Sequence, residues 1–171
     1  STLVNKGLEF MEVKWLFDVD PERIQVVVQP QSIIHSMVEF DDGAVIAQLG
    51  TPDMKLPIQY ALYYPQRRYL PGDRLDFWKL SQITFEKPDT ETFRGLTLAY
   101  RALREGGSMP TVYNAANEKA VSLFLDGKIR YLDITDIIED CMDSHLTLTS
   151  PSVEDILGVE REVYERIESR W

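Results

Sequence analysis

The opening segment of the chain holds three polar side chains whose spacing could bind an anion and a metal ion. Asn5, Lys6 and Glu9 fall within the first turns of a helix that apolar periodicity predicts over residues 1–17. Near a helix start, free backbone N–H groups together with a lysine favour an anion such as a phosphate. A carboxylate one turn later favours a cation. The spacing therefore predicts a phosphorylated substrate beside a divalent metal.

The predicted burial of this helix bears on the role of Glu9. The apolar residues form two stripes, Val4, Leu8, Met11 and Trp15, and Phe10, Val13 and Phe17. A helix that is apolar on two sides is mostly buried, so we expect the Glu9 carboxylate near the interior, where an unpaired charge is costly. A second interpretation stays open: Glu9 pairs with Lys6 or Lys14 on the surface of its own helix and does nothing more.

A loop at residues 50–54 and the two histidines are the other candidates. Asp53 and Met54 lie in this proline-containing loop and could line a pocket. His35 lies on an apolar-rich strand, where we expect a ring that is hydrogen-bonded within the sheet rather than a ligand. His145 follows a predicted helix beside acidic residues, and we expect it to face solvent.

Composition and motifs exclude several functions. The chain has neither G-x-G-x-x-G nor G-x-x-x-x-G-K-[ST], and so it lacks the dinucleotide fingerprint and the P-loop. It shows no Cys/His metal spacing and no nucleophile elbow. A net charge of -10 argues against nucleic acid and anionic membranes as partners. Cys141 is the only cysteine, so we expect no internal disulfide and a reducing, cytoplasmic location.

The elements that must position these residues form two parts. The first part is expected to contain a helix at 1–17, strands at 24–28, 33–40 and 44–49, and a helix at 58–64. Asp42-Gly43 is a hairpin signal between the last two strands. The second part is expected to contain helices at 90–104, 110–125 and 133–142, and one from Ser152 to the end. Between the parts, residues 66–88 are interpreted as a strap with one lone strand at 82–85.

This pattern predicts an α+β fold, with a partial mixed or antiparallel sheet and helices, followed by a small helical bundle. The predicted division is 1–64 for the α+β part, 65–88 for a linker and 89–171 for the bundle. The first part is incomplete as a sheet, because three strands leave exposed edges.

The chain resembles the C-terminal half of the 1-deoxy-D-xylulose 5-phosphate reductoisomerase family in three segments. These segments read NKGLEFMEVKWLF (5–17), QPQSIIHSMVEFDDGAVIAQLGTPDMKLPIQYALYYP (29–65) and NAANEKAV (114–121). The resemblance runs over essentially the whole chain and is strongest over residues 5–65. So long an ordered string is far more specific than any short motif.

The resemblance implies an enzyme of isoprenoid biosynthesis that depends on NADPH and on a divalent metal, Mg²⁺ or Mn²⁺. Such an enzyme rearranges and reduces 1-deoxy-D-xylulose 5-phosphate to 2-C-methyl-D-erythritol 4-phosphate. Members are V-shaped homodimers with an N-terminal nucleotide-binding domain, a central catalytic domain with a mobile lid, and a C-terminal helical domain. By this resemblance, residues 1–64 would belong to the catalytic domain, and NADPH would be bound by a domain upstream of this chain.

Residue roles carry over where the sequence matches the family. In the N-K-G-x-E pattern, Asn5 and Lys6 would bind the sugar-phosphate substrate, and Glu9 would ligate the metal and also touch the substrate. The metal would polarise the substrate's carbonyl and stabilise the charge that builds on oxygen. Pro52 and Met54 match the family's P-D-M loop and would line the pocket near the lid.

Other positions qualify the resemblance. His35 matches a histidine of a family strand, for which we expect a supporting role. Gln29 stands where the family commonly has a histidine before Pro-Gln-Ser, so any role of that ring is absent. The resemblance places the nucleotide site and the other metal ligands upstream of Ser1. We therefore expect the chain alone to be inactive, with no cofactor-binding residue of its own.

The competing hypothesis belongs to a different class of function. The chain could be a stand-alone interaction module, whose sheet and bundle serve to dimerise or to bind a partner. Exposed sheet edges invite pairing with another chain. Both hypotheses therefore predict a homodimer formed by edge pairing or by exchange between copies.

Overall fold

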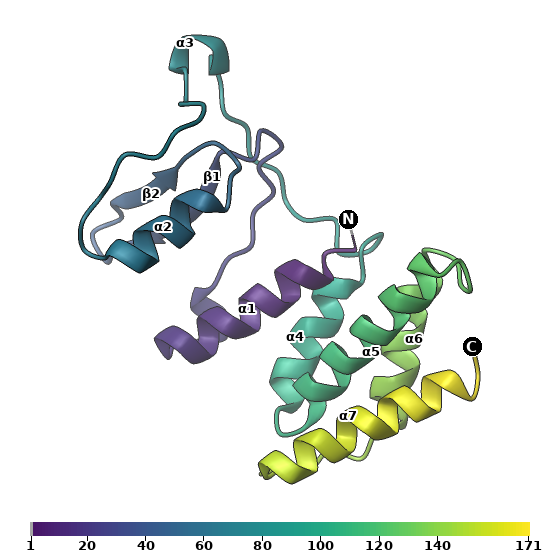
Figure 1. Ribbon diagram of the computed structural model, residues 1–171. Helices are drawn as coiled ribbons and strands as arrows, with labels where there is room; N and C mark the ends of the chain where they lie inside the picture. Colours follow the sequence, from purple (N-terminus) through teal and green to yellow (C-terminus); the bar gives the residue numbers. More distant parts are fainter. Residues whose placement is uncertain (1) are drawn as a thin grey trace. The chain divides into compact units, whose positions relative to one another are not determined.

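The computed structural model of this protein describes residues 2–171 and has the α+β composition expected from the sequence (Figure 1). It divides into two compact units. The helical unit contains Ser1–Val26 and Asp89–Trp171, and the hairpin unit contains Val27–Pro88. No helix in the described part of the chain is both long enough and apolar enough to cross a membrane.

The helical unit is a bundle built around one central helix. Its helices are α1 (Val4–Phe17), α4 (Gly95–Glu105), α5 (Met109–Leu125), α6 (Asp133–Ser144) and α7 (Val153–Glu168), with a 3-10 turn at Pro21–Arg23. α5 packs against α4, α6 and α7, and α1 packs against α4 (Figure 1). The largest fully buried core side chains are Tyr113, Leu96, Met109, Ile137, Ile138, Met142 and Ile167.

The helix expected at 90–104 begins later, at Gly95. The cause is local, because the Asp89 side chain accepts the Thr92 N–H at 3.0 Å and forms a separate turn. At the other end of the bundle, the capping signal before α7 is confirmed. Ser152 Oγ accepts the Asp155 N–H at 3.2 Å, and Asp155 Oδ2 accepts the Ser152 N–H at 2.9 Å. These four atoms fix where α7 starts.

Close packing attaches α1 to the bundle at the glycine of the N-K-G-x-E pattern. A Cβ atom at Gly7 would lie 2.4 Å from Ala99 Cβ and 2.7 Å from the Tyr113 hydroxyl. That hydroxyl donates to the carbonyl oxygens of Val4 at 3.3 Å and Gly95 at 3.0 Å. Gly7 therefore allows the close approach of α1 to α4, and Tyr113 satisfies two buried backbone acceptors there.

The hairpin unit contains β1 (Ile34–Glu39), β2 (Val45–Leu49), α2 (Lys55–Tyr63) and α3 (Phe77–Leu80). The two strands form an antiparallel hairpin in which Met37 pairs with Ala47. Gly43 has a φ of +84° in the connecting turn, a conformation that glycine adopts without strain. The hairpin predicted from Asp42-Gly43 is thus confirmed.

Two further strands predicted from the sequence are wrong. In the described part of the chain, residues 24–28 and 82–85 form no strand. Val28 and Glu86 make an isolated antiparallel bridge instead, with N–H···O distances of 3.0 and 2.9 Å. A β-branched run favours a strand only where a neighbouring strand offers a ladder, and here the pairing stops after one residue. The sheet accordingly has two strands rather than three.

The packing units do not follow the predicted division into 1–64, 65–88 and 89–171. α1 packs with the helical unit because Val4, Phe10 and Met11 bury their side chains there, and residues 65–88 group with the hairpin. The predicted division rests on the family's functional domains rather than on packing, and it stays a prediction.

Candidate functional site

The structure brings Asn5, Lys6 and Glu9 together on the first turns of α1. Asn5 Nδ2 donates to Glu9 Oε1 at 2.8 Å, and Lys6 Nζ lies 2.5 Å from Glu9 Oε2. Each oxygen of the carboxylate therefore has one donor from its own helix. The side chains of Lys6 and Glu9 are each 45% exposed. A ligand from solvent can reach all three polar groups from one side of the helix.

The expected burial of Glu9 is wrong. Both apolar stripes of α1 are buried toward the N-terminus, at Val4, Phe10 and Met11, and open at the C-terminal end of the helix, where Trp15 is 68% and Phe17 71% exposed. Apolar periodicity shows which residues share a stripe, but not how much of the stripe a partner covers. The observed geometry matches the second interpretation from the sequence, in which the Glu9 carboxylate pairs with Lys6 on the surface of its own helix.

The N-cap residue of α1 provides no side-chain cap. Leu3 occupies the N-cap position with a φ of 59°, and its side chain makes no capping hydrogen bond. Thr2 Oγ1 accepts the Val4 N–H at 3.3 Å. The first N–H to reach a carbonyl of the helix start is that of Gly7, which donates to Leu3 at 3.0 Å. The positive end of the helix thus lies beside Asn5 and Lys6.

The donor set around Glu9 fits a divalent metal only in part. The carboxylate is half exposed, and both groups that contact it are flexible side chains that can move away. Among residues 2–171, no three His, Cys, Asp or Glu side chains gather in an arrangement that could hold a metal. Because Mg²⁺ takes six ligands and Mn²⁺ prefers the same oxygen donors, Glu9 fits as one ligand of a larger set.

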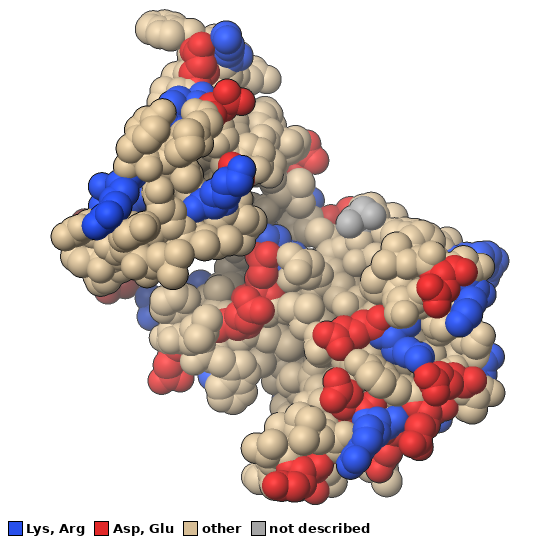
Figure 2. All heavy atoms as spheres, viewed as in Figure 1, with Lys and Arg blue, Asp and Glu red and all other residues tan. Residues whose placement is uncertain are grey.

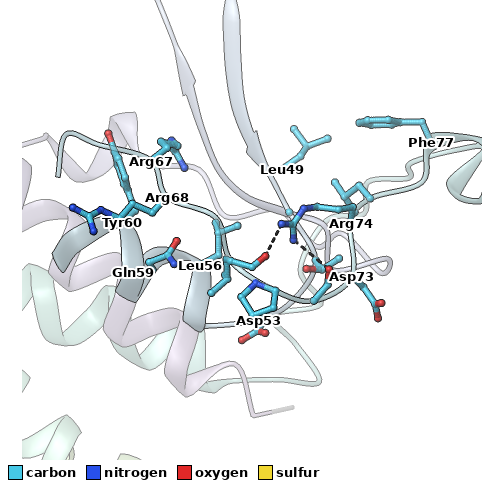
Figure 3. Close-up of a pocket in the computed structure, with 16 residues that line it drawn as sticks. Leu49, Asp53, Leu56, Gln59, Tyr60, Arg67, Arg68, Asp73, Arg74 and Phe77 are labelled. Atoms are coloured by element: carbon cyan, nitrogen blue, oxygen red, sulfur yellow. Dashed lines mark hydrogen bonds between the residues drawn. The ribbon is translucent and has the colours of Figure 1, made fainter. Parts of the chain in front are cut away.

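The hairpin unit has a concavity of about 470 Å³ between the loop after β2, helix α2 and residues 67–77 (Figure 3). Asp53 lies in its wall, as the sequence predicts. Its Oδ1 accepts the Lys55 N–H at 2.9 Å at the start of α2. Pro52 and Met54 do not line this concavity and are exposed, Met54 by 70%. Their predicted role beside the substrate stays a prediction.

His35 and Gln29 differ in the hydrogen bonds that their side chains make. The His35 side chain is exposed on β1, and its ring has no hydrogen-bond partner within residues 2–171, contrary to expectation. Gln29, which stands where the family commonly has histidine, accepts the N–H groups of Ile33 at 2.7 Å and Ile34 at 3.3 Å through Oε1. Its amide thereby holds the chain at the entry to β1.

A buried hydroxyl beside His145 was missed from the sequence. Ser108 is fully buried, and its Oγ lies 2.7 Å from His145 Nε2 while accepting the Leu148 N–H at 2.9 Å. His145 is thus partly buried rather than facing solvent. Burial lowers the pKa of His145, and nearby Glu162 opposes that shift. No local pattern links residues so far apart in sequence, so the contact follows only from the fold.

Comparison with known proteins assigns the chain to a family. The family model described as the DXP reductoisomerase C-terminal domain matches residues 49–166. The 1-deoxy-D-xylulose 5-phosphate reductoisomerases of Agathobacter rectalis and Lachnospira eligens are 63% and 65% identical to it over 171 residues. The chain belongs to the 1-deoxy-D-xylulose 5-phosphate reductoisomerase family. The resemblance noted from the sequence is therefore confirmed, and the chain spans about half, 45%, of the length of these curated relatives.

Solved reductoisomerase structures share the fold. The Zymomonas mobilis enzyme in complex with NADPH matches 99% of this chain and 45% of its own, with a TM-score of 0.91 and 46% identity. A reductoisomerase in complex with NADPH, fosmidomycin and magnesium matches 98% of this chain and 43% of its own, with a TM-score of 0.91 and 40% identity. The cofactors of these relatives are thus NADPH and a divalent metal.

Proposed function

We propose that this chain supplies a substrate- and metal-binding helix and the helical domain of a 1-deoxy-D-xylulose 5-phosphate reductoisomerase. The intact protein would use NADPH and Mg²⁺ or Mn²⁺ to convert 1-deoxy-D-xylulose 5-phosphate to 2-C-methyl-D-erythritol 4-phosphate. One observation carries the proposal: Asn5, Lys6 and Glu9 share one accessible side of α1, in a chain that matches reductoisomerases along its whole length.

The geometry supports separate roles for the three side chains. Asn5 and Lys6 offer amide and ammonium donors at the positive end of α1, where a phosphorylated substrate is favoured. Both now donate to Glu9, and they would be free to bind the substrate if that carboxylate held a cation. A bound divalent metal would polarise the substrate's carbonyl. Glu9 would supply one of its ligands.

Two exposed apolar residues complete the proposed contacts of this chain. Pro52 and Met54 present their side chains to solvent in the loop before α2. An exposed Met side chain is adaptable and suits a pocket that closes around a ligand. We assign both to the wall of the substrate site and His35 to support of the hairpin. NADPH would be bound by parts of the protein outside residues 1–171.

The test replaces the proposed metal ligand in a complete reductoisomerase that contains this sequence. Glu9→Gln keeps the shape of the side chain and removes its charge, and we expect loss of activity by at least about a hundredfold. Glu12→Gln, an exposed glutamate on the same helix, is the matched control and should keep activity. Metal-dependent NADPH oxidation measures both. Full activity of the Glu9→Gln protein would contradict the assignment.

A homodimer is the proposed assembly. Within the described residues each hairpin strand has only one strand partner, so each has a free edge. The hairpin also exposes Met37, Val38, Phe40, Val45 and Ile46. Free edges with apolar side chains favour association between copies, and the same feature supports the alternative of an interaction module. Sedimentation that shows a strict monomer at high concentration would count against both.

Because Cys141 is buried and unpaired, we place the protein in the reducing cytoplasm.

A further inference from the structure

One end of the concavity in the hairpin unit is basic and carries no compensating carboxylate. Arg67 and Arg68 lie at this end and Arg74 at the other, and none of the three has an ion-pair partner within residues 2–171. Figure 3 shows Arg67 and Arg68 beside Tyr60 at one end and Arg74 beside Asp73 at the other. The two ends of the concavity therefore differ in their free positive charge.

The chain has 28 acidic and 18 basic residues, and five arginines of the helical unit pair with carboxylates, whereas Arg104 and Arg161 have no such pair within residues 2–171. The arginine pairs of the helical unit are Arg94 with Asp136 and Glu139, Arg101 with Glu105 and Asp143, Arg130 with Asp133, and Arg166 and Arg170 with Asp140. Figure 2 shows basic side chains of the bundle against acidic ones, while in the hairpin unit some basic side chains lie against acidic ones and others are bordered by uncharged side chains. Carboxylates are in excess overall, so the lack of an ion pair at Arg67 and Arg68 leaves room for another anion.

Tyrosine rings hold two of the guanidinium groups in place. Arg67 Cζ lies 4.0 Å from the centre of the Tyr60 ring, and Arg68 Cζ lies 4.1 Å from that of Tyr63. Stacking restrains the planar group but leaves its N–H donors directed outward in the plane. Such a fork matches the oxygens of a phosphate or carboxylate. Neither guanidinium uses these donors on a protein acceptor among the described residues.

At the opposite end of the concavity, Arg74 already donates its hydrogen bonds to backbone carbonyls. Arg74 Nη2 donates to the Leu70 carbonyl at 2.5 Å and Nη1 to the Gly72 carbonyl at 3.3 Å, which stabilises the loop (Figure 3). Asp53 lies 3.7 Å from Lys55 Nζ. Its remaining oxygen capacity and the nearby Gln59 suit hydroxyl groups rather than a second anion. The lining thus suits a small molecule with one anionic end.

We propose that this concavity is an anion site that takes the phosphate group of a small organic phosphate at Arg67 and Arg68. Its volume of about 470 Å³ lies within the range of small-molecule sites. Its lining residues all belong to the hairpin unit, whereas Asn5 and Lys6 belong to the helical unit. The proposal stands on the hairpin unit alone and does not depend on the reductoisomerase reaction.

The test is a titration of the ¹⁵N-labelled chain with inorganic phosphate and with glycerol 3-phosphate, at constant ionic strength set with sodium chloride. We expect saturable shifts of the Arg67 and Arg68 signals and of the amides around Tyr60, with tighter binding of glycerol 3-phosphate. Arg67→Gln and Arg68→Gln should each weaken binding about fivefold, since each removes one exposed charge-assisted contact. Arg68→Lys keeps the positive charge but lacks the two parallel N–H donors of a guanidinium. Its affinity should lie between those of the unaltered chain and Arg68→Gln.

Two matched variants separate the outcomes. Arg130→Gln removes an exposed arginine paired with Asp133 and should leave the affinity unchanged. Lys6→Gln removes the cation of the α1 site and should also leave the shifts near Arg67 unchanged. Three results would each overturn the proposal. They are loss of those shifts in Lys6→Gln, an affinity of Arg67→Gln and Arg68→Gln equal to that of the unaltered chain, and non-saturating shifts that chloride reproduces. The last result would indicate an adventitious ion only.

Discussion

Lys6 Nζ lies 2.5 Å from Glu9 Oε2, one turn apart on the accessible side of α1. This contact joins the group proposed to bind substrate to the group proposed to bind metal. In the absence of ligands the Lys6 ammonium and the Glu9 carboxylate neutralise each other, so neither charge is unpaired. A cation at Glu9 and a phosphate at Lys6 would separate the pair, and each ligand would favour binding of the other.

Glu9→Gln should change the stability of the chain very little. The Lys6–Glu9 pair is half exposed, and exposed ion pairs contribute roughly 0–1 kcal/mol, so we expect a loss below about 1 kcal/mol. Urea unfolding followed by circular dichroism measures it. A loss above about 2 kcal/mol would mean that Glu9 has a structural role that its contacts do not show.

Gly7→Ala should destabilise the chain, because the added Cβ would lie 2.4 Å from Ala99 Cβ. Overpacking of this kind costs about 1–3 kcal/mol. Gly158→Ala is the matched control, since nothing lies within 4 Å of its Cβ position on α7, and it should stabilise by roughly 0.5–1 kcal/mol. Denaturant midpoints of the two variants should move in opposite directions. Equal shifts would show that the α1–α4 contact is looser than described.

The sequence predicted features that depend on residues close together in the chain. The capping pair Ser152 and Asp155 was predictable because all its atoms lie within one helical turn. The grouping of Asn5, Lys6 and Glu9 was predictable for the same reason, since helical spacing alone brings them together. Local signals thus located the proposed site on α1.

Features that depend on distant partners were not predictable. Glu9 was expected inside because two stripes of α1 are apolar, but periodicity does not reveal that the C-terminal part of both stripes is exposed. The concavity near Arg67 and Arg68 depends on how an irregular segment folds back on α2, and no periodic pattern describes that segment. Ser108 and His145 meet only because α5 and α6 pack together. Tertiary packing therefore decides burial and the second site.

Stability should fall as pH falls through the titration of His145. Burial holds its pKa below the ordinary value of about 6.5, so the unfolded chain binds the proton more readily than the folded chain. The contribution is therefore fully present above about pH 6.5 and is lost as the pH falls below it. We expect the free energy of unfolding to decrease from about pH 7.5 to 5.5.

The variant His145→Gln isolates this contribution, because glutamine does not titrate. Its free energy of unfolding should change less over the same pH interval than that of the unaltered chain. His35→Gln removes the other histidine, which is exposed, and should keep the original pH dependence. Identical pH profiles for the unaltered chain and His145→Gln would remove His145 as the cause.

The chain by itself should neither oxidise NADPH nor bind Mn²⁺ tightly. It has no dinucleotide fingerprint, and no three candidate ligands meet in its described part, so Glu9 would be a single protein ligand. The measurement is the absorbance of NADPH with 1-deoxy-D-xylulose 5-phosphate and Mn²⁺, with a complete reductoisomerase as the positive control. Substrate-dependent oxidation by the chain would show that residues 1–171 contain a nucleotide site, and the division of labour proposed for the intact protein would then be wrong.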